Sequence, residues 1–169
     1  MTEPTGSQPP TLSELQEFLA QWWYLYDEAQ VAEFGPRLAP DVRFVSRSDS
    51  GSSPVEALLA GATHGREETA EWLREHRLVN PYPLRHIMTN LFRTGGGPAS
   101  TAFRAYGFVT KIAGGLPVNV STFVSSGQVA RGPQGLWITE LEVVIDTVAS
   151  RPAGEALAER TAAGTRAGS

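Results

Sequence analysis

The segment TLSELQEFLAQWWYLYDE, residues 11–28, decides the fold because it reads as one amphipathic helix. Its apolar residues recur at the three- and four-residue spacings of one helix face: Leu12, Leu15, Leu19, Trp22 and Tyr26. Thr11 and Glu14 match the capping box that opens a helix. Gly35 and Pro36 predict that the helix has ended before them.

After this helix, the sequence predicts one more helix and several strands. DVRFV, residues 41–45, reads as a short strand, and SRSDSGSSP, residues 46–54, reads as a loop by composition. Thr63 is then expected to cap a second helix over GREETAEWLREHRL, residues 65–78. One side of that helix carries Thr69, Trp72, Leu73 and His76.

The second half of the chain predicts a meander of long antiparallel strands. The turn signals TGGGP, AGGLP and RGPQG separate four strand-like runs, near residues 83–93, 100–113, 117–130 and 136–148. Two or three helices followed by such a meander indicate the α+β class. A sheet that curls round the helices leaves a concave apolar interior, where small molecules usually bind.

Composition and charge limit the partners and the cellular compartment that we expect for this protein. The 169 residues predict one domain over residues 11–148, with disordered ends at 1–10 and 149–169 that are rich in small residues and proline. A net charge of −4 without a basic stripe argues against a nucleic-acid partner. The chain has no cysteine, its start lacks the pattern of a signal peptide, and no apolar run is long enough for a membrane span. A cytoplasmic protein with no membrane contact is therefore expected.

The stretch PLRHIMTNLF, residues 83–92, places an ionisable ring on a core-facing side. His86 alternates in phase with Leu84, Met88 and Phe92. An imidazole titrates near neutrality, so it can take and return a proton beside a carbonyl group. The alternative is a buried neutral histidine that hydrogen-bonds the backbone or Asn90.

Several pieces, in this order, resemble the SnoaL-like branch of the nuclear transport factor 2-like superfamily. They are YLYDE at the end of the first helix, LAPDVRF, HGREETAEWL, the histidine-bearing RHIMTN, STAFRAYGFV, and GPQGLWITELEVV. That branch includes polyketide cyclases and scytalone dehydratase. The resemblance implies a cone-shaped α+β barrel, in which N-terminal helices pack on a strongly curved, mostly antiparallel sheet.

The resemblance also implies a site. His86 matches the strand histidine that acts as general base, and Asp27 matches the acidic residue at the end of the first helix. The second histidine or aspartate of the dehydratase pattern is missing, because the next strand has Ala105, Gly107 and Val109. The expected pocket wall consists of Trp22, Trp23, Tyr26, Met88, Asn90, Phe103 and Ala105. Aromatic residues at helical spacing are also what a plain hydrophobic core requires.

We therefore expect a cofactor-free dehydratase, isomerase or cyclase that acts on a small, apolar, carbonyl-containing, polyketide-like metabolite. The alternative is a non-catalytic small-molecule-binding protein or a subunit similar to the small subunit of ring-hydroxylating dioxygenases. No metal site is expected, because the three histidines are scattered, and His64 and His76 occupy positions typical of surface histidines. A homodimer that pairs through outer sheet faces is expected. The sequence leaves open which way Glu140, Glu142 and Asp146 point.

Overall fold

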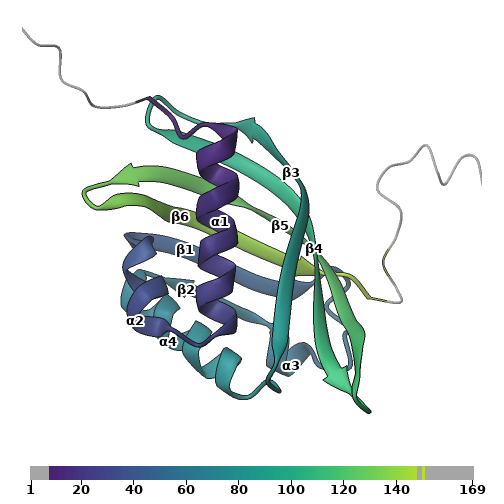
Figure 1. Cartoon of the computed structure of the whole chain (residues 1–169). Helices are drawn as coiled ribbons and strands as arrows, with labels where there is room; N and C mark the ends of the chain where they lie inside the picture. Colours follow the sequence, from purple (N-terminus) through teal and green to yellow (C-terminus); the bar gives the residue numbers. More distant parts are fainter. Residues whose placement is uncertain (1–7, 148–149, 151–169) are drawn as a thin grey trace, which may run out of the picture.

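The computed structural model describes residues 8–147 and 150, and these form helices packed against one curved sheet (Figure 1). The chain begins with α1 (Leu12–Asp27), α2 (Val31–Phe34), the 3-10 turn η1 (Gly35–Arg37), β1 (Leu38–Ser48), α3 (Glu56–Leu59), β2 (Gly61–His64) and α4 (Arg66–Leu78). It continues with β3 (Leu84–Gly95), β4 (Ser100–Ala113), β5 (Leu116–Gly132) and β6 (Gly135–Ile145).

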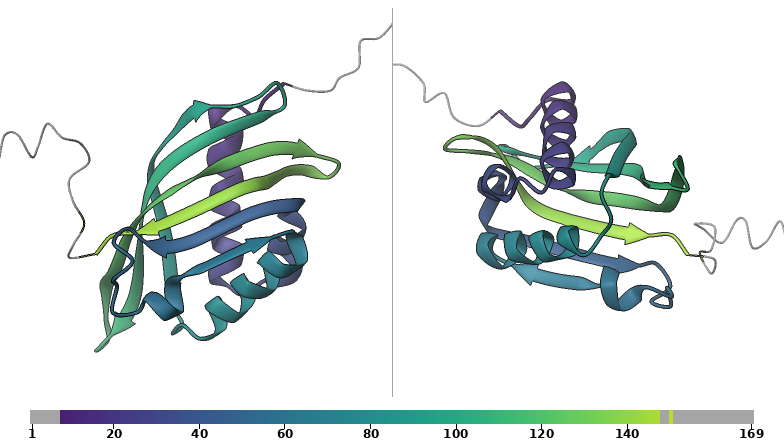
Figure 2. Two further views of the ribbon diagram at one scale, coloured as in Figure 1. Left: turned by 180° about the vertical axis from the view of Figure 1, so that it is seen from behind. Right: turned by 60° about the horizontal axis from the view of Figure 1, so that its bottom comes forward.

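In this described part of the chain the strands form a six-stranded sheet in the order β2-β1-β6-β5-β4-β3. Strands β3 to β6 form an antiparallel meander, and β6 then pairs with β1 in parallel. Helix α1 crosses the concave side of the sheet, and α4 lies beside β1 and β2, as the two views of Figure 2 show. The predicted α+β fold with a curved, mostly antiparallel sheet is thus confirmed.

Helix α1 forms as its sequence predicts. The Thr11 amide donates to the Glu14 carboxylate at 2.8 Å, and the Glu14 amide donates back to the Thr11 hydroxyl at 3.3 Å, which completes the capping box. The apolar face of α1 is buried against the sheet through Leu15, Phe18, Leu19, Trp22, Trp23 and Tyr26. Burial of these large side chains is the main contribution of α1 to the core.

Two of the predicted boundaries were wrong. Strand β1 runs to Ser48, so residues 46–48 belong to the sheet and not to a loop. The buried Ser48 is satisfied by Glu56, which accepts from its amide at 3.1 Å and also from its hydroxyl. Thr63 is not a helix cap, because it lies in β2 and its hydroxyl pairs with that of Thr69 at 2.8 Å. The N-cap of α4 is Gly65, with φ of 90°.

A bulge in β3 overturns the predicted alternation of its side chains. The pairing with β4 shifts between Thr89 and Phe92, and Asn90 adopts a φ of 53°. Beyond this point the phase of the strand is reversed. Leu91 packs against the core, and Phe92, which was expected to face inward, is 50% exposed.

The ends of the predicted domain are only partly described. Within residues 8–10, the Pro10 carbonyl accepts from the Thr101 hydroxyl at 2.7 Å, and the Gln8 carbonyl accepts from Arg131 at 2.9 Å. Residues 1–7, 148–149 and 151–169, where disorder and the last residue of the domain were expected, lie outside the described residues.

Gly107 leaves room for the Phe123 ring on the concave side of the sheet. A Cβ at this position would lie 2.1 Å from that ring, which is itself buried. We expect Gly107→Ala to lower the free energy of unfolding by about 1 to 3 kcal/mol, because the core must shift to accept the methyl group. Urea unfolding followed by circular dichroism measures the change.

The matched control for this substitution is Gly35→Ala. A Cβ on Gly35 meets its nearest neighbour at an ordinary 3.7 Å. Its backbone already has helical angles, so the free energy of unfolding should change by less than about 1 kcal/mol. Equal destabilisation by the two variants would contradict the packing argument.

Candidate functional site

Asp27 and His86 form the hydrogen-bonded pair on which the candidate site is built. One carboxylate oxygen of Asp27, at the end of α1, lies 2.6 Å from Nδ1 of His86 near the start of β3. The other oxygen accepts from the His86 backbone amide at 2.8 Å. The side chains of His86 and Asp27 are only 9% and 4% exposed. His86 thus hydrogen-bonds both carboxylate oxygens of Asp27, and these contacts fix the orientation of the imidazole.

This contact assigns the roles of the two ring nitrogens. A carboxylate can only accept, so the proton between the side chains lies on Nδ1 of His86. In the neutral ring Nε2 then carries the lone pair, and it makes no hydrogen bond to the described residues. A histidine held in this tautomer by a carboxylate is arranged to take a proton at Nε2.

Aromatic rings surround the imidazole of His86. The Trp23 ring is stacked on it at a centroid distance of 4.6 Å and an interplanar angle of 14°. The Tyr26 ring meets it edge-on at 5.2 Å, and Phe123 lies at 6.1 Å. The indole ring of Trp23 therefore covers one face of the imidazole.

Arg77 anchors the same end of α1 from helix α4. Its Nε donates to the main-chain carbonyl of Asp27 at 2.8 Å, and it is buried at 3% exposure. Its guanidinium also lies 3.4 Å from the carbonyl of Pro81, in the segment that leads into β3. Arg77 therefore holds together the two chain segments that carry the pair. In the sequence, Arg77 follows a run of charged residues, and this position did not indicate that its side chain is buried.

His76 is a second imidazole of the interior, and the expectation of a surface position was wrong. Its Nδ1 lies 2.6 Å from the Tyr26 hydroxyl, and its ring is stacked on Trp72 at 4.9 Å. The helical phase did place His76 on one side with Thr69 and Leu73, which are both buried. This helical phase was the sequence signal that His76 faces the interior. It was a better guide than the usual exposure of a histidine near a helix end.

Burial determines the protonation states of the hydrogen-bonded residues Tyr26 and His76. Burial lowers the pKa of His76 to about 4, and the neighbouring His86 and Arg77 add to the effect. Burial also raises the pKa of Tyr26 well above its usual value, with Asp27 adding to the rise and Arg77 opposing it. Both members of the Tyr26–His76 pair are therefore uncharged near neutral pH.

The structure brings most of the predicted wall residues to the concave side. Trp22 packs against Trp23 at 5.0 Å and is stacked with Tyr26 at 6.0 Å. Met88 lies in register with Gly107 and packs partly buried against the core, and Phe103 and Ala105 are buried on β4. Asn90 is exposed on the bulge, and the structure does not bring it to His86.

The acidic residues of the last strand point away from this interior. Glu140 pairs with Arg43, and Glu142 pairs with Arg47 at 3.0 Å, both from β1. Asp146 follows the strand and accepts from the Thr122 hydroxyl at 2.5 Å. None of these three carboxylates replaces the acid that is missing from the dehydratase pattern.

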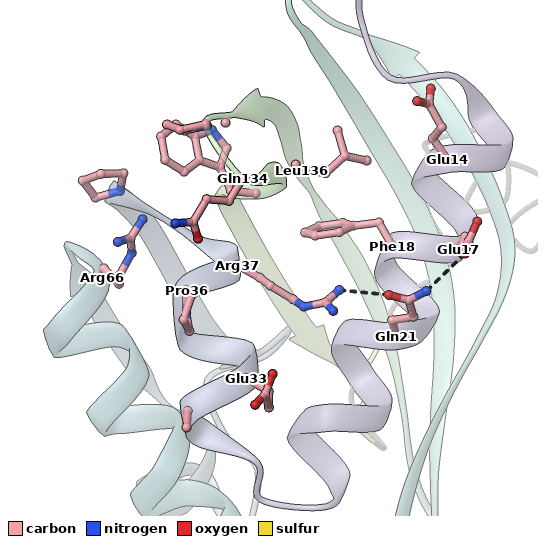
Figure 3. A pocket seen from close by; sticks show the side chains of 16 residues that line it. Glu14, Glu17, Phe18, Gln21, Glu33, Pro36, Arg37, Arg66, Gln134 and Leu136 are labelled. Carbon is pink, nitrogen blue, oxygen red and sulfur yellow. Dashed lines mark hydrogen bonds between the residues drawn. The ribbon is translucent and has the colours of Figure 1, made fainter.

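A hollow lies elsewhere, between α1, η1 and the β5–β6 hairpin (Figure 3). Its volume is about 810 Å³, and its wall includes Phe18, Arg37, Arg66 and Trp137. Arg37 donates to Gln21 at 3.1 Å across this groove. Neither Asp27 nor His86 lines it. The Asp27–His86 pair is instead enclosed by the aromatic side chains around it.

Two wider observations concern the residues 8–147 and 150. In this part of the chain no three His, Asp or Glu side chains come together in a way that would hold a metal ion. Within the same residues no helix has the length and apolar character that crossing a membrane requires.

Comparison with known proteins assigns the fold and the family. A solved NTF2-like protein with a cystatin-like fold from Novosphingobium aromaticivorans is similar, with 16% sequence identity, 86% of each chain covered and a TM-score of 0.64. The sequence profile of the SnoaL-like domain matches residues 11–141. The chain therefore belongs to the SnoaL-like domain family, within the cone-shaped NTF2-like fold.

Two further structures indicate the range of this fold. ActVI-ORFA from Streptomyces coelicolor is 16% identical, with 79% of this chain and 95% of that chain covered and a TM-score of 0.63. The beta subunit of benzoate 1,2-dioxygenase from Burkholderia mallei is also 16% identical, with 82% and 92% covered and a TM-score of 0.62. Among curated proteins none matches the chain. Such likeness shows the fold, which is shared by cyclases, dehydratases and dioxygenase subunits.

The depressed pKa of His76 makes stability depend on pH in a defined direction. Between about pH 6.5 and 4 the unfolded chain binds a proton at His76 that the folded chain does not, so stability falls as the pH falls through this window. The loss from this group amounts to up to about 3 kcal/mol. Urea unfolding of the wild type and His76→Gln at several pH values should show a shallower decline for the variant.

The control for this measurement is His64→Gln, which removes an exposed histidine. Its decline with pH should parallel that of the wild type. A His76→Gln curve that also stays parallel to the wild type would show that His76 takes up its proton freely in the folded chain.

Proposed function

We propose that this chain is a cofactor-free acid–base catalyst, a dehydratase, isomerase or cyclase, that acts on a small, apolar, carbonyl-containing, polyketide-like metabolite. The Asp27–His86 pair is the observation that carries the proposal, because a carboxylate orients an imidazole whose Nε2 is left without a partner among the described residues. Membership of the SnoaL-like family, which includes cyclases and dehydratases, supports the same reaction class.

The proposed step moves one proton. Nε2 of His86 takes a proton from the carbon next to the carbonyl group. The C–H electron pair forms the enolate double bond, and the carbonyl π electrons move to the oxygen. The imidazolium then returns the proton to another carbon in an isomerisation or gives it to a departing hydroxyl in a dehydration. Asp27 and the face of Trp23 stabilise the imidazolium between these events.

The candidate site has the aromatic and apolar character expected of a site that binds such a metabolite. Its wall is formed by aromatic rings from Trp22, Trp23, Tyr26 and Phe123 around the imidazole. Aromatic side chains bind flat apolar ring systems by stacking. Since the rings also fill the space beside His86, a substrate has to displace or turn some of them on entry.

Hydrogen–deuterium exchange tests the proton transfer without knowledge of the natural substrate. A panel of aryl 1,3-diketones is incubated with the protein in D₂O, and loss of the signal from the carbon-bound proton is followed by NMR. We expect His86→Asn to slow the protein-dependent exchange by about 10²- to 10⁴-fold, the usual contribution of a positioned base. Asp27→Asn should slow it less, because the ring is kept but misoriented.

His64→Gln is the matched control and should exchange like the wild type, because this histidine is exposed on β2. A purely structural histidine predicts the reverse for His86→Asn: a lower melting temperature and unchanged exchange per folded molecule. That result would refute the catalytic proposal.

A non-catalytic subunit is the second candidate, and the exposed outer face of the sheet favours it. Strand register puts Ile87, Phe92, Tyr106, Phe108, Val124 and Val144 on the convex side, and this set is called the outer face. Ile87, Phe92 and Tyr106 are 39%, 50% and 56% exposed. A fold shared with a dioxygenase beta subunit fits such a face. Co-purification of an iron-containing partner protein would support this candidate.

We propose instead that a second copy of this chain covers the outer face. We expect light scattering to give a dimer for the wild type at micromolar concentration. Tyr106→Lys places a charge in the centre of the outer face and should weaken dimerisation by about 30-fold or more. Tyr24→Lys alters a tyrosine that is 61% exposed on α1 and should leave the dimer intact. A monomeric wild type would refute the homodimer.

A further inference from the structure

The groove between α1, η1 and the β5–β6 hairpin contains two arginines that lack a carboxylate partner (Figure 3). Five other arginines of the described residues form ion pairs with glutamates. Arg37 and Arg66 form none within residues 8–147 and 150. Arg37 donates to the neutral amide oxygen of Gln21 at 3.1 Å, and Nε of Arg66 donates to the Leu38 carbonyl at 2.7 Å. In this part of the chain, both guanidinium charges therefore lie in the groove wall without direct neutralisation.

An aromatic ring lies beside each of the two guanidinium groups. The guanidinium carbon of Arg37 lies 5.9 Å from the centroid of the Phe18 ring, and that of Arg66 lies 5.9 Å from the centroid of the Trp137 ring. An arginine that lies over the face of a ring keeps the N–H groups at the edge of its own plane available for a carboxylate. The rings thus support the two cations and leave their remaining N–H groups for a ligand.

Apolar side chains form part of the same groove wall. Phe18 is buried, and Leu136 and Trp137 are partly buried and pack against the same core. Gly132 makes room for the Trp137 ring, because a Cβ at that position would lie 2.6 Å from it. The groove volume of about 810 Å³ is sufficient for a small organic ligand. The groove therefore combines an apolar surface with two cations.

Three glutamates also line the groove, and they limit the charge of a ligand. Glu14 is already in an ion pair at 2.9 Å, and Glu17 accepts from Gln21 at 3.2 Å. Glu33 is exposed on α2. Figure 3 shows Glu14 and Glu17 on α1, across the groove from Arg66 on α4. A ligand with several negative charges would be repelled by these carboxylates, so the groove favours one negative charge on an apolar body.

We propose that this groove is a second small-molecule site, which binds an aromatic monocarboxylate. The carboxylate accepts hydrogen bonds from Arg37 and Arg66, and the planar apolar body of the ligand packs against Leu136 and Trp137. Neither Asp27 nor His86 lines the groove. The site is therefore separate from the acid–base pair, and the inference does not depend on the proposed function.

Binding of 2-naphthoate tests the site, with 2-naphthamide and 2-naphthyl phosphate as matched probes. The amide has the same ring system and a group of similar size without charge, and the phosphate carries more negative charge. Isothermal titration calorimetry should show that 2-naphthoate binds at least about 10-fold more tightly than either of the others. Equally tight binding of the amide would contradict the role of the arginines. Tighter binding of the phosphate would overturn the choice of a monocarboxylate.

Single substitutions test the two cations. Arg37→Gln and Arg66→Gln should each weaken 2-naphthoate binding by about 10- to 100-fold, because each removes a charged hydrogen-bond donor. Arg93→Gln removes the charge of an exposed arginine on β3 and should bind like the wild type. His86→Asn should also bind like the wild type, since His86 does not line the groove. Weaker binding by His86→Asn with unchanged binding by the two arginine variants would place the probe in the interior and overturn the proposal.

NMR of the tryptophan indole N–H groups locates the probe even if Arg66→Gln fails to fold, as Arg66 also bonds the Leu38 carbonyl. Trp137 lies in the groove wall, whereas Trp22 and Trp23 are buried in the interior. Saturation of the wild type with 2-naphthoate should shift the Trp137 signal and leave the signals of Trp22 and Trp23 unchanged. An unshifted Trp137 signal in the saturated protein, or no binding to the wild type, would refute the site.

Salt dependence gives an independent measure on the wild type. Both arginines are only partly buried, so added sodium chloride should screen their attraction for a carboxylate. Binding of 2-naphthoate should weaken as the salt concentration rises, while the weaker binding of 2-naphthamide should not. Affinity for 2-naphthoate that is independent of salt would contradict a site built on two cations.

Discussion

The carboxylate of Asp27 is the contact on which the arrangement of the interior depends. It joins the end of the first helix to an edge strand 59 residues later, by two hydrogen bonds to one residue. A buried carboxylate is costly unless its oxygens are satisfied. Here His86 satisfies both, and Arg77 holds the adjoining carbonyl from a second helix. The hydrogen bonds that satisfy the buried carboxylate of Asp27 also orient the imidazole ring of His86.

The interior combines two histidines with different hydrogen-bond partners within one aromatic cluster. His86 has a carboxylate partner at Nδ1 and a stacked indole ring. His76 has a phenol partner, a buried ring and a nearby cation, and these keep it neutral. The two rings therefore differ in their partners and in their surroundings.

The concave and convex sides of the sheet differ in what packs against them. Small residues in register, such as Gly107 and Ala105, leave space on the concave side for the rings of Phe123 and its neighbours. On the convex side the apolar outer face is uncovered in the single chain. Two carboxylates of β6, Glu140 and Glu142, face outward and pair with Arg43 and Arg47 of β1.

The sequence by itself determined the helix at residues 12–27 and the meander, because local hydrophobic period and turn chemistry specify both. It also indicated Asp27 and His86 by resemblance, and the structure places the two side chains in contact. The bulge at Asn90 and the inward position of His76 were decided only by the tertiary structure. Strand phase after a bulge and the burial of a helix-end histidine depend on neighbours distant in the chain. Those neighbours, Tyr26 foremost, become neighbours only when α1 and α4 pack together.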